Sequence, residues 1–143
     1  MITTILKAAA TTAGCDQVFY ESKDLANVIT DQALQGNIFC LIIQPDSVRL
    51  EVKGNGIRDH FPAHVVEIMQ QVKLEDTAEN NEVVYANLLE IAKKLIWALI
   101  ETQSFTKIAT VNAVKIPETK YDFNPIGWSL TLDLIPIEND NQC

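Results

Sequence analysis

The chain has 143 residues and a formal net charge of −8. The length fits one domain, and 48% hydrophobic with 21% charged residues predicts a folded core rather than disorder. The negative charge argues against a basic phosphate-binding face, and no apolar run approaches the roughly 18 residues that cross a bilayer.

The first quarter of the chain predicts two helices separated by a short strand. Apolar residues at helical spacing indicate a helix over Met1–Ala13, which Gly14 can end, and its start carries no signal-peptide pattern. Residues 17–20 are β-prone. Ser22 can cap a second helix, and Gly36 can end it in a left-handed conformation.

Two strands and a loop follow. The continuous apolar run 38–43 predicts a strand covered on both faces. Val48, Leu50 and Val52 alternate with charged residues, which predicts a half-buried strand that pairs with the first in a hairpin. Residues 54–62 are rich in turn formers and predict a loop, or the tip of an arm.

Residues 63–74 are ambiguous between helix and strand. Val65, Ile68, Met69 and Val72 fit helical spacing, whereas a twisted strand tolerates the less regular alternation. A helix that Asp76 or Thr77 can cap begins directly afterwards, so we favour a strand.

The long helix from residue 77 to 101 is the clearest prediction. A capping oxygen at Asp76 stands three residues before Glu79, as in a capping box. The following residues fall on one broad apolar face: Val84, Tyr85, Leu88, Ala92, Leu95, Ile96 and Leu99. The opposite face holds Asn87, Glu90, Lys93, Lys94 and Glu101. This helix should organise the core, because each buried apolar side chain contributes roughly 1.5–3 kcal/mol.

Trp97 breaks the polar pattern of that opposite face. The indole can lie flat over the stems of Lys93 and Lys94, or it can contact another protein, because indoles are enriched at interfaces. The contact hypothesis predicts that Trp97 is substantially exposed in an isolated subunit.

Two strands close the chain. Residues 108–116 alternate weakly, whereas Trp128, Leu130, Leu132 and Leu134 form a clean apolar side opposite Ser129, Thr131 and Asp133. Pro136 should end the ladder. The elements together predict an α+β fold over residues 1–137. We expect a mixed or antiparallel sheet of about four to five strands, with the long helix on one face, N-terminal helices and a polar tail at 138–143.

No residue pattern predicts catalysis, a cofactor or a metal site. Asp59-His60 with His64 is the best enzyme-like cluster, but Pro62 argues against one shared helical face. Gly54-x-Gly56 lacks the rest of a phosphate loop. The cysteines, at positions 15, 40 and 143, are odd in number and form no Cys-x-x-Cys pair, and Cys40 fits a buried strand position. Asp122 and Asn124 beside Pro125 are turn formers.

Four segments carry a family resemblance: the N-terminal helix from Met1, the strand 37–43 before a proline turn, Leu74–Glu79 opening the long helix, and Tyr121–Trp128 leading into the last strand. In this order they resemble small tail-completion or tail-terminator proteins of tailed bacteriophages. More narrowly, they resemble neck and tail ring components of phages that infect Bacteroidetes, including the crAss-like group. Residues 54–62 depart from that pattern.

The resemblance implies a structural virion protein without an active site, located at the head–tail connector, the neck or the upper tail. Such proteins form homo-oligomeric rings, contact neighbouring neck or tail proteins, and let genomic DNA pass without specific binding. The interface candidates are Trp97, Lys94, Glu90 and Glu101 on the helix, and Arg58, His60 and Phe61 in the 54–62 segment. We expect acidic side chains to line the channel.

Two alternatives remain. The chain could be a small α+β ligand-binding module or cone-fold enzyme, with Asp59, His60 or His64 at a cavity between helix and sheet. A pocket of several hundred Å³ that contains a buried acid or imidazole would favour it. The chain could also be a non-viral adaptor, which sedimentation would distinguish from a ring.

Overall fold

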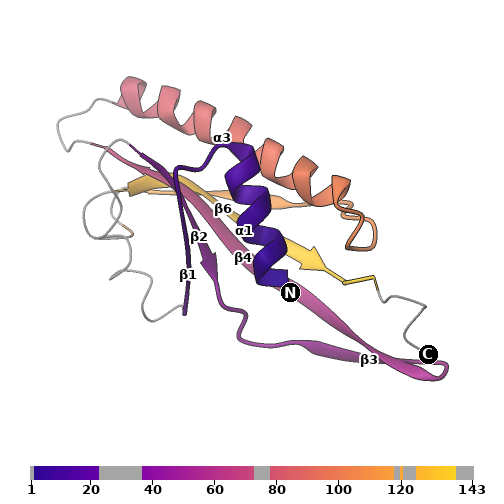
Figure 1. Ribbon diagram of the computed structural model, residues 1–143. Coiled ribbons are helices and arrows are strands. Elements are labelled where there is room, and N and C mark those ends of the chain that lie inside the picture. The colour runs from indigo at the N-terminus through magenta and orange to yellow at the C-terminus, as the bar shows by residue number, and fades with distance from the viewer. Residues whose placement is uncertain (1, 23–36, 73–77, 118–119, 121–124, 138–143) are drawn as a thin grey trace.

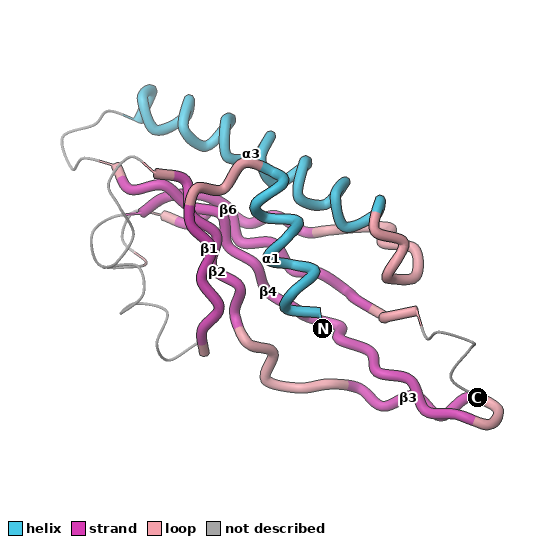
Figure 2. Tube along the Cα trace, in the orientation of Figure 1, coloured by secondary structure: helices cyan, strands magenta, loops and turns pink. Residues whose placement is uncertain are grey.

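The protein folds as a helical layer on one face of a mixed β-sheet, which confirms the expected α+β class (Figures 1 and 2). The computed structural model describes residues 2–22, 37–72, 78–117, 120 and 125–137. Helices α1 (Ile2–Ala13) and α3 (Ala78–Glu101) cross each other on the same side of the sheet.

The sheet has six strands rather than four or five, in the order β1-β2-β4-β6-β5, with β3 pairing β4 away from that path. The pairs are antiparallel except β1 with β2, which is parallel. The strand bounds are β1 Gln17–Glu21, β2 Ile38–Ile43, β3 Arg49–Lys53, β4 Gly56–Gln71, β5 Asn112–Ile116 and β6 Pro125–Leu134.

Strand β4 is the strand that joins the arm to the centre of the sheet. Its second half lies in the centre of the sheet between β2 and β6, whereas Gly56–His60 pair β3 and Phe61 pairs Leu134 of β6. The two halves meet at a register shift between Phe61 and His64, which contains Pro62. A bulge is one of the few strand positions that tolerate proline, which has no N–H for the ladder.

The main core fills the space between the two helices and the sheet. Alternation along the strands turns Val66 and Ile68 of β4 towards the helices, together with the leucines of β6. The long helix packs one face against these side chains. The buried residues of that helix are Asn81, Leu88, Ile91, Ala92, Leu95 and Leu99. Leu88, Leu95, Leu130 and Leu132 therefore share one interior, as the periodicities predict.

The other face of the sheet carries a smaller apolar cluster of Phe39, Leu41, Met69 and Ile116. Strand β2 is thus buried on both faces, which confirms the interpretation of its continuous apolar run, and Cys40 is fully buried within it.

Two strand predictions are wrong. Residues 49–53 pair β4 instead of β2, and their apolar side is exposed instead of half-buried. Residues 56–62 are not a loop: only Gly54 and Asn55 turn the chain, with Gly54 at φ 53°, and strand β4 begins at Gly56. Pro62, which argued for the loop, lies at the register shift instead.

The helix α1, the strands β1, β2, β4 and β6, and the long helix α3 are confirmed. Strand β5 is shorter than predicted, beginning at Asn112 instead of residue 108. Several predictions lie outside the described residues: the helix from Ser22 to Gly36, the cap at Asp76 or Thr77, the turn at Asp122 and Asn124, and the tail at 138–143.

Candidate functional site

A two-stranded arm projects from the body of the protein. Strand β3 and the first half of β4 extend beyond the other strands and away from the helices (Figure 1). Cross-strand register places Val52 opposite Ile57 and Leu50 opposite Asp59 on one face. Leu50, Val52 and Ile57 are all exposed, Val52 to 77%. The arm therefore carries an apolar stripe, Leu50–Val52–Ile57, that the described part of the chain leaves in solvent.

The opposite face of the arm is polar and tied to the body. His60 joins Glu51 across the arm, Nδ1 to Oε1 at 2.6 Å, and Asp133 of β6, Nε2 to Oδ1 at 2.5 Å. Arg58 donates to Glu51 at 3.1 Å, and this guanidinium is the main reason that the pKa of Glu51 lies below its ordinary value. We call these four residues the arm clamp, because they fix the arm to β6.

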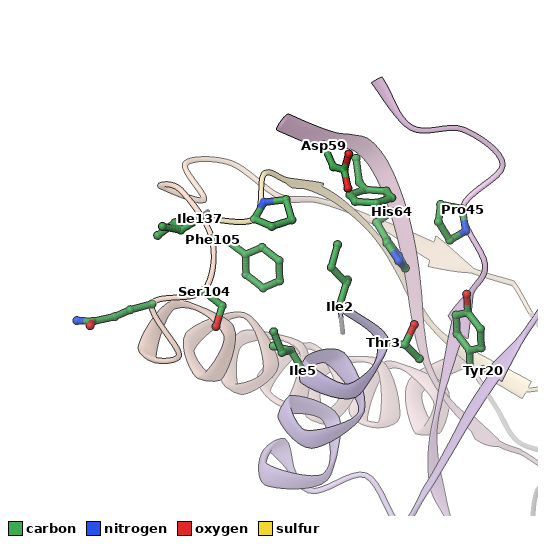
Figure 3. A pocket seen from close by; sticks show the side chains of 13 residues that line it. Ile2, Thr3, Ile5, Tyr20, Pro45, Asp59, His64, Ser104, Phe105 and Ile137 are labelled. Atoms are coloured by element: carbon green, nitrogen blue, oxygen red, sulfur yellow. The ribbon is translucent and has the colours of Figure 1, made fainter. Parts of the chain in front are cut away.

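A pocket of about 880 Å³ opens at the base of the arm, beside the start of α1 and the loop after α3 (Figure 3). Ile2, Ile5 and Phe105 point into it, and Asp59 lies at its upper rim in the view. The lining residues are mostly apolar: Ile2, Thr3, Ile5, Tyr20, Pro45, Asp59, Phe61, His64, Gln103, Ser104, Phe105, Pro136 and Ile137. We call it the arm-base pocket.

His64 is the buried polar group of the arm-base pocket. His64 is only 2% exposed, and its Nδ1 has no hydrogen-bond partner in the described part of the protein. Burial lowers the pKa of His64, and a backbone group of Val65 opposes this shift. Burial therefore favours the neutral imidazole, and Nδ1 is enclosed by the protein rather than open to the pocket. Asp59 is exposed and forms no ion pair with the described residues.

Trp97 lies on the outer face of α3 and is 61% exposed, which confirms the exposure that the contact hypothesis predicts. Beside it is a shallow hollow of about 360 Å³, lined by Thr12, Glu90, Lys93, Lys94, Trp97, Ala98 and Glu101. Lys93 pairs with Glu90 at 2.9 Å. Lys94 has no ion pair within the described residues.

The structure brings together only part of the candidate residues. Glu90, Lys94, Trp97 and Glu101 share the outer face of α3, as predicted, and there they line one hollow. In contrast, Phe61 lines the arm-base pocket with His64, whereas His60 contacts Asp133 on the sheet face away from the helices. The postulated cluster of Asp59, His60 and His64 is therefore split between the two faces of β4.

The sequence alone does not reveal the apolar stripe or most of the pocket wall. The sequence predicts a half-buried strand for Leu50 and Val52 and a loop for Ile57, and Ile2, Phe105 and Ile137 meet only through the fold. The alternation of Val48, Leu50 and Val52 was the available signal for the stripe. Among the described residues, no group of His, Cys, Asp or Glu side chains is arranged to hold a metal ion.

Comparison with protein-family models finds no match for this chain, and comparison with curated proteins finds no relative. Among the helices within the described ranges, none is long and apolar enough to span a membrane.

Proposed function

We propose that this chain is a structural subunit of a ring at the head–tail connector, the neck or the upper tail of a tailed bacteriophage. In this role it surrounds the channel through which the genome passes. The observation that carries the proposal is the pair of unsatisfied surfaces: the apolar arm with its base pocket, and the outer face of α3 with Trp97.

A closed ring needs heterologous contacts, so each subunit must present two different complementary surfaces. The pocket at the arm base and the hollow beside Trp97 have no lining residue in common, so one subunit can use both at once. A two-stranded hairpin is marginally stable alone in water, and an exposed apolar stripe on it favours burial against a partner.

The charge also suits a channel for DNA. A net charge of −8 per subunit disfavours tight phosphate contacts, which would slow the passage of the genome. We expect acidic side chains on the inner wall of the ring. A ring whose inner wall is dominated by lysine and arginine would contradict this expectation.

The direct test is the assembly state of the purified chain. Mass photometry and native mass spectrometry, from nanomolar to about 100 µM, should reveal a species of several subunits, and negative-stain images should show closed rings. Monomers that neither assemble alone nor join a purified phage neck complex would contradict the proposal.

A ligand-binding module is the second candidate, and one observation favours it. The arm-base pocket has the volume of a small-molecule site, about 880 Å³, and contains the buried imidazole of His64. Thermal shift screening of small-molecule libraries tests it: a ligand that stabilises the wild-type protein but not a pocket variant would support this candidate.

A further inference from the structure

We propose that the arm-base pocket receives Trp97 of a second copy of this chain, with the indole ring packed against the apolar wall of the pocket. The inference rests on the proposed ring function, because it identifies the contact by which one subunit would hold the next. Its occupant is the outer face of α3, not a small molecule.

The shapes and polarity of the two surfaces agree. The pocket is walled largely by aliphatic, aromatic and proline side chains and is larger than one indole ring requires. Trp97 is the only tryptophan whose ring is mostly exposed, because Trp128 is half-buried and its indole N–H donates to the Tyr85 carbonyl at 2.8 Å. An exposed indole gains most from such a site, since tryptophan is enriched among the residues that dominate interface energies.

The charges at the two rims are also complementary. Asp59 at the mouth of the pocket and Lys94 beside Trp97 both lack an ion pair among the described residues. Insertion of Trp97 would bring a neighbouring lysine to the carboxylate. Charges at an interface rim contribute more to orientation and association rate than to affinity, which suits a contact that must fix one rotation per subunit.

The arm can extend the same contact along the helix. Val83, Trp97 and Ile100 are exposed on α3, and at about 100° per residue the other two lie within about 60° of Trp97. Val83 and Trp97 are about 21 Å apart along the helix, and the five residues of β3 span about 17 Å. The stripe itself, from Leu50 to Val52, spans about 7 Å, which is enough to cover about one turn of a neighbouring α3 beside Trp97.

Two variants that each block one side of the contact test the inference. Trp97→Ala removes the inserted ring, and Ile137→Arg places a charge at the exposed rim of the pocket. Each variant alone should lose self-association, about thirtyfold or more in Kd, measured by sedimentation velocity and native mass spectrometry. An equimolar mixture should form a one-to-one heterodimer and stop there, because one intact contact remains. Val114→Ala, on the exposed edge strand β5, is the matched control and should assemble like wild type.

Two further variants test the charges at the two rims. Lys94→Glu and Asp59→Lys should each slow association. Mixing the two charge-reversed proteins should restore the rate, because each contact between them again pairs a lysine with a carboxylate. Lys115→Glu, the control reversal on β5, should leave association unchanged.

The outcomes separate the inference from the ring proposal. Association that survives Trp97→Ala, a mixture that does not form the heterodimer, or a wild-type chain that stays monomeric to about 1 mM would overturn the inference. Rings that form independently of Trp97 would leave the ring proposal standing without this contact. The predicted heterodimer together with open wild-type polymers would support the contact and contradict the closed ring.

Discussion

His60 and His64 lie four residues apart on the same strand and have opposite environments. His60 bridges two carboxylates on the face of the sheet away from the helices, whereas His64 lies in an apolar pocket on the helical side. The register shift between Phe61 and His64 and the alternation of the strand produce this separation. A pair of histidines that suggested one site in the sequence therefore serves two.

The buried histidine should make stability depend on pH. The pKa of His64 is lowered in the folded protein from an ordinary value of 6.5, mainly by burial. The unfolded chain then binds more protons between the two values, so the free energy of unfolding should fall as the pH drops below 6.5. Chemical denaturation of wild type and His64→Leu between about pH 5 and pH 8 measures this.

The slope contributed by His64 should disappear in the variant. Asp59 is the only other charged side chain that lines the pocket among the described residues, and Asp59→Asn is the control that retains the imidazole. Equal slopes for wild type and His64→Leu would contradict the burial of a neutral imidazole.

Gly127 is the second position at which one residue decides local structure. A Cβ built there would lie 1.8 Å from the backbone carbonyl oxygen of Ile68, so β4 and β6 must separate to accept any side chain. Gly127→Ala should lower the free energy of unfolding by about 2 kcal/mol or more. Gly56→Ala, where nothing lies within 4 Å, should change it by less than about 0.5 kcal/mol. Urea denaturation compares the two, and equal values would contradict the close approach.

At the scale of elements, the arm depends on its polar face for its position. The apolar stripe is exposed, so beyond the backbone ladder and the packing of Phe61 the arm clamp of Glu51, Arg58, His60 and Asp133 supplies the side-chain contacts of the hairpin. A bridge from His60 to β6 restrains the arm near its base and leaves the turn at Gly54 and Asn55 to extend outwards.

Breaking the clamp should loosen the arm without unfolding the body. His60→Ala removes both contacts, and the amides of β3 and the first half of β4 should exchange about tenfold faster in hydrogen–deuterium exchange. The amides of β2 and the second half of β4 should retain wild-type protection. Unchanged exchange in the arm would show that the clamp does not restrain it.

Most elements could be predicted because their patterns are local. The periodicity of α3, the apolar run of β2 and the alternation of β6 each identify an element and its core face. The arm could not be predicted in full, because alternation at Leu50 and Val52 indicates a strand with one apolar face but not what covers that face. Pairing of β3 with β4 instead of β2 depends on the two-residue turn at Gly54 and Asn55. Pro62 obscured this pairing in the sequence, because a proline so close to the turn suggested a loop instead of a strand.

The candidate site, likewise, could be predicted only in part. The exposure of Trp97 could be predicted because one apolar residue interrupts a polar helical face. The pocket could not be predicted, because its walls come from the start of α1, the base of the arm and the segments that follow α3 and β6. Such a cavity exists only in the folded chain, and no spacing in the sequence encodes it.

At the scale of the whole molecule, exposed apolar side chains on the arm should govern assembly rather than folding. Val52 is mostly exposed and far from the core, so Val52→Lys should change the free energy of unfolding by less than about 0.5 kcal/mol. The same variant should weaken self-association, because it places an ammonium on the stripe. Val114→Lys, at a site on β5 that is 63% exposed, should leave assembly intact. Loss of assembly in the control alone would locate the contact at the edge strand instead.

The continuity of β4 also has a mechanical consequence. A force applied at the tip of the arm passes along one covalent backbone into the centre of the sheet, where β2 and β6 flank the strand. Pulling along that direction loads many ladder hydrogen bonds in parallel instead of opening them one after another. A subunit gripped by its arm would therefore resist extraction, and the bulge at Pro62 would be the first place to yield under tension.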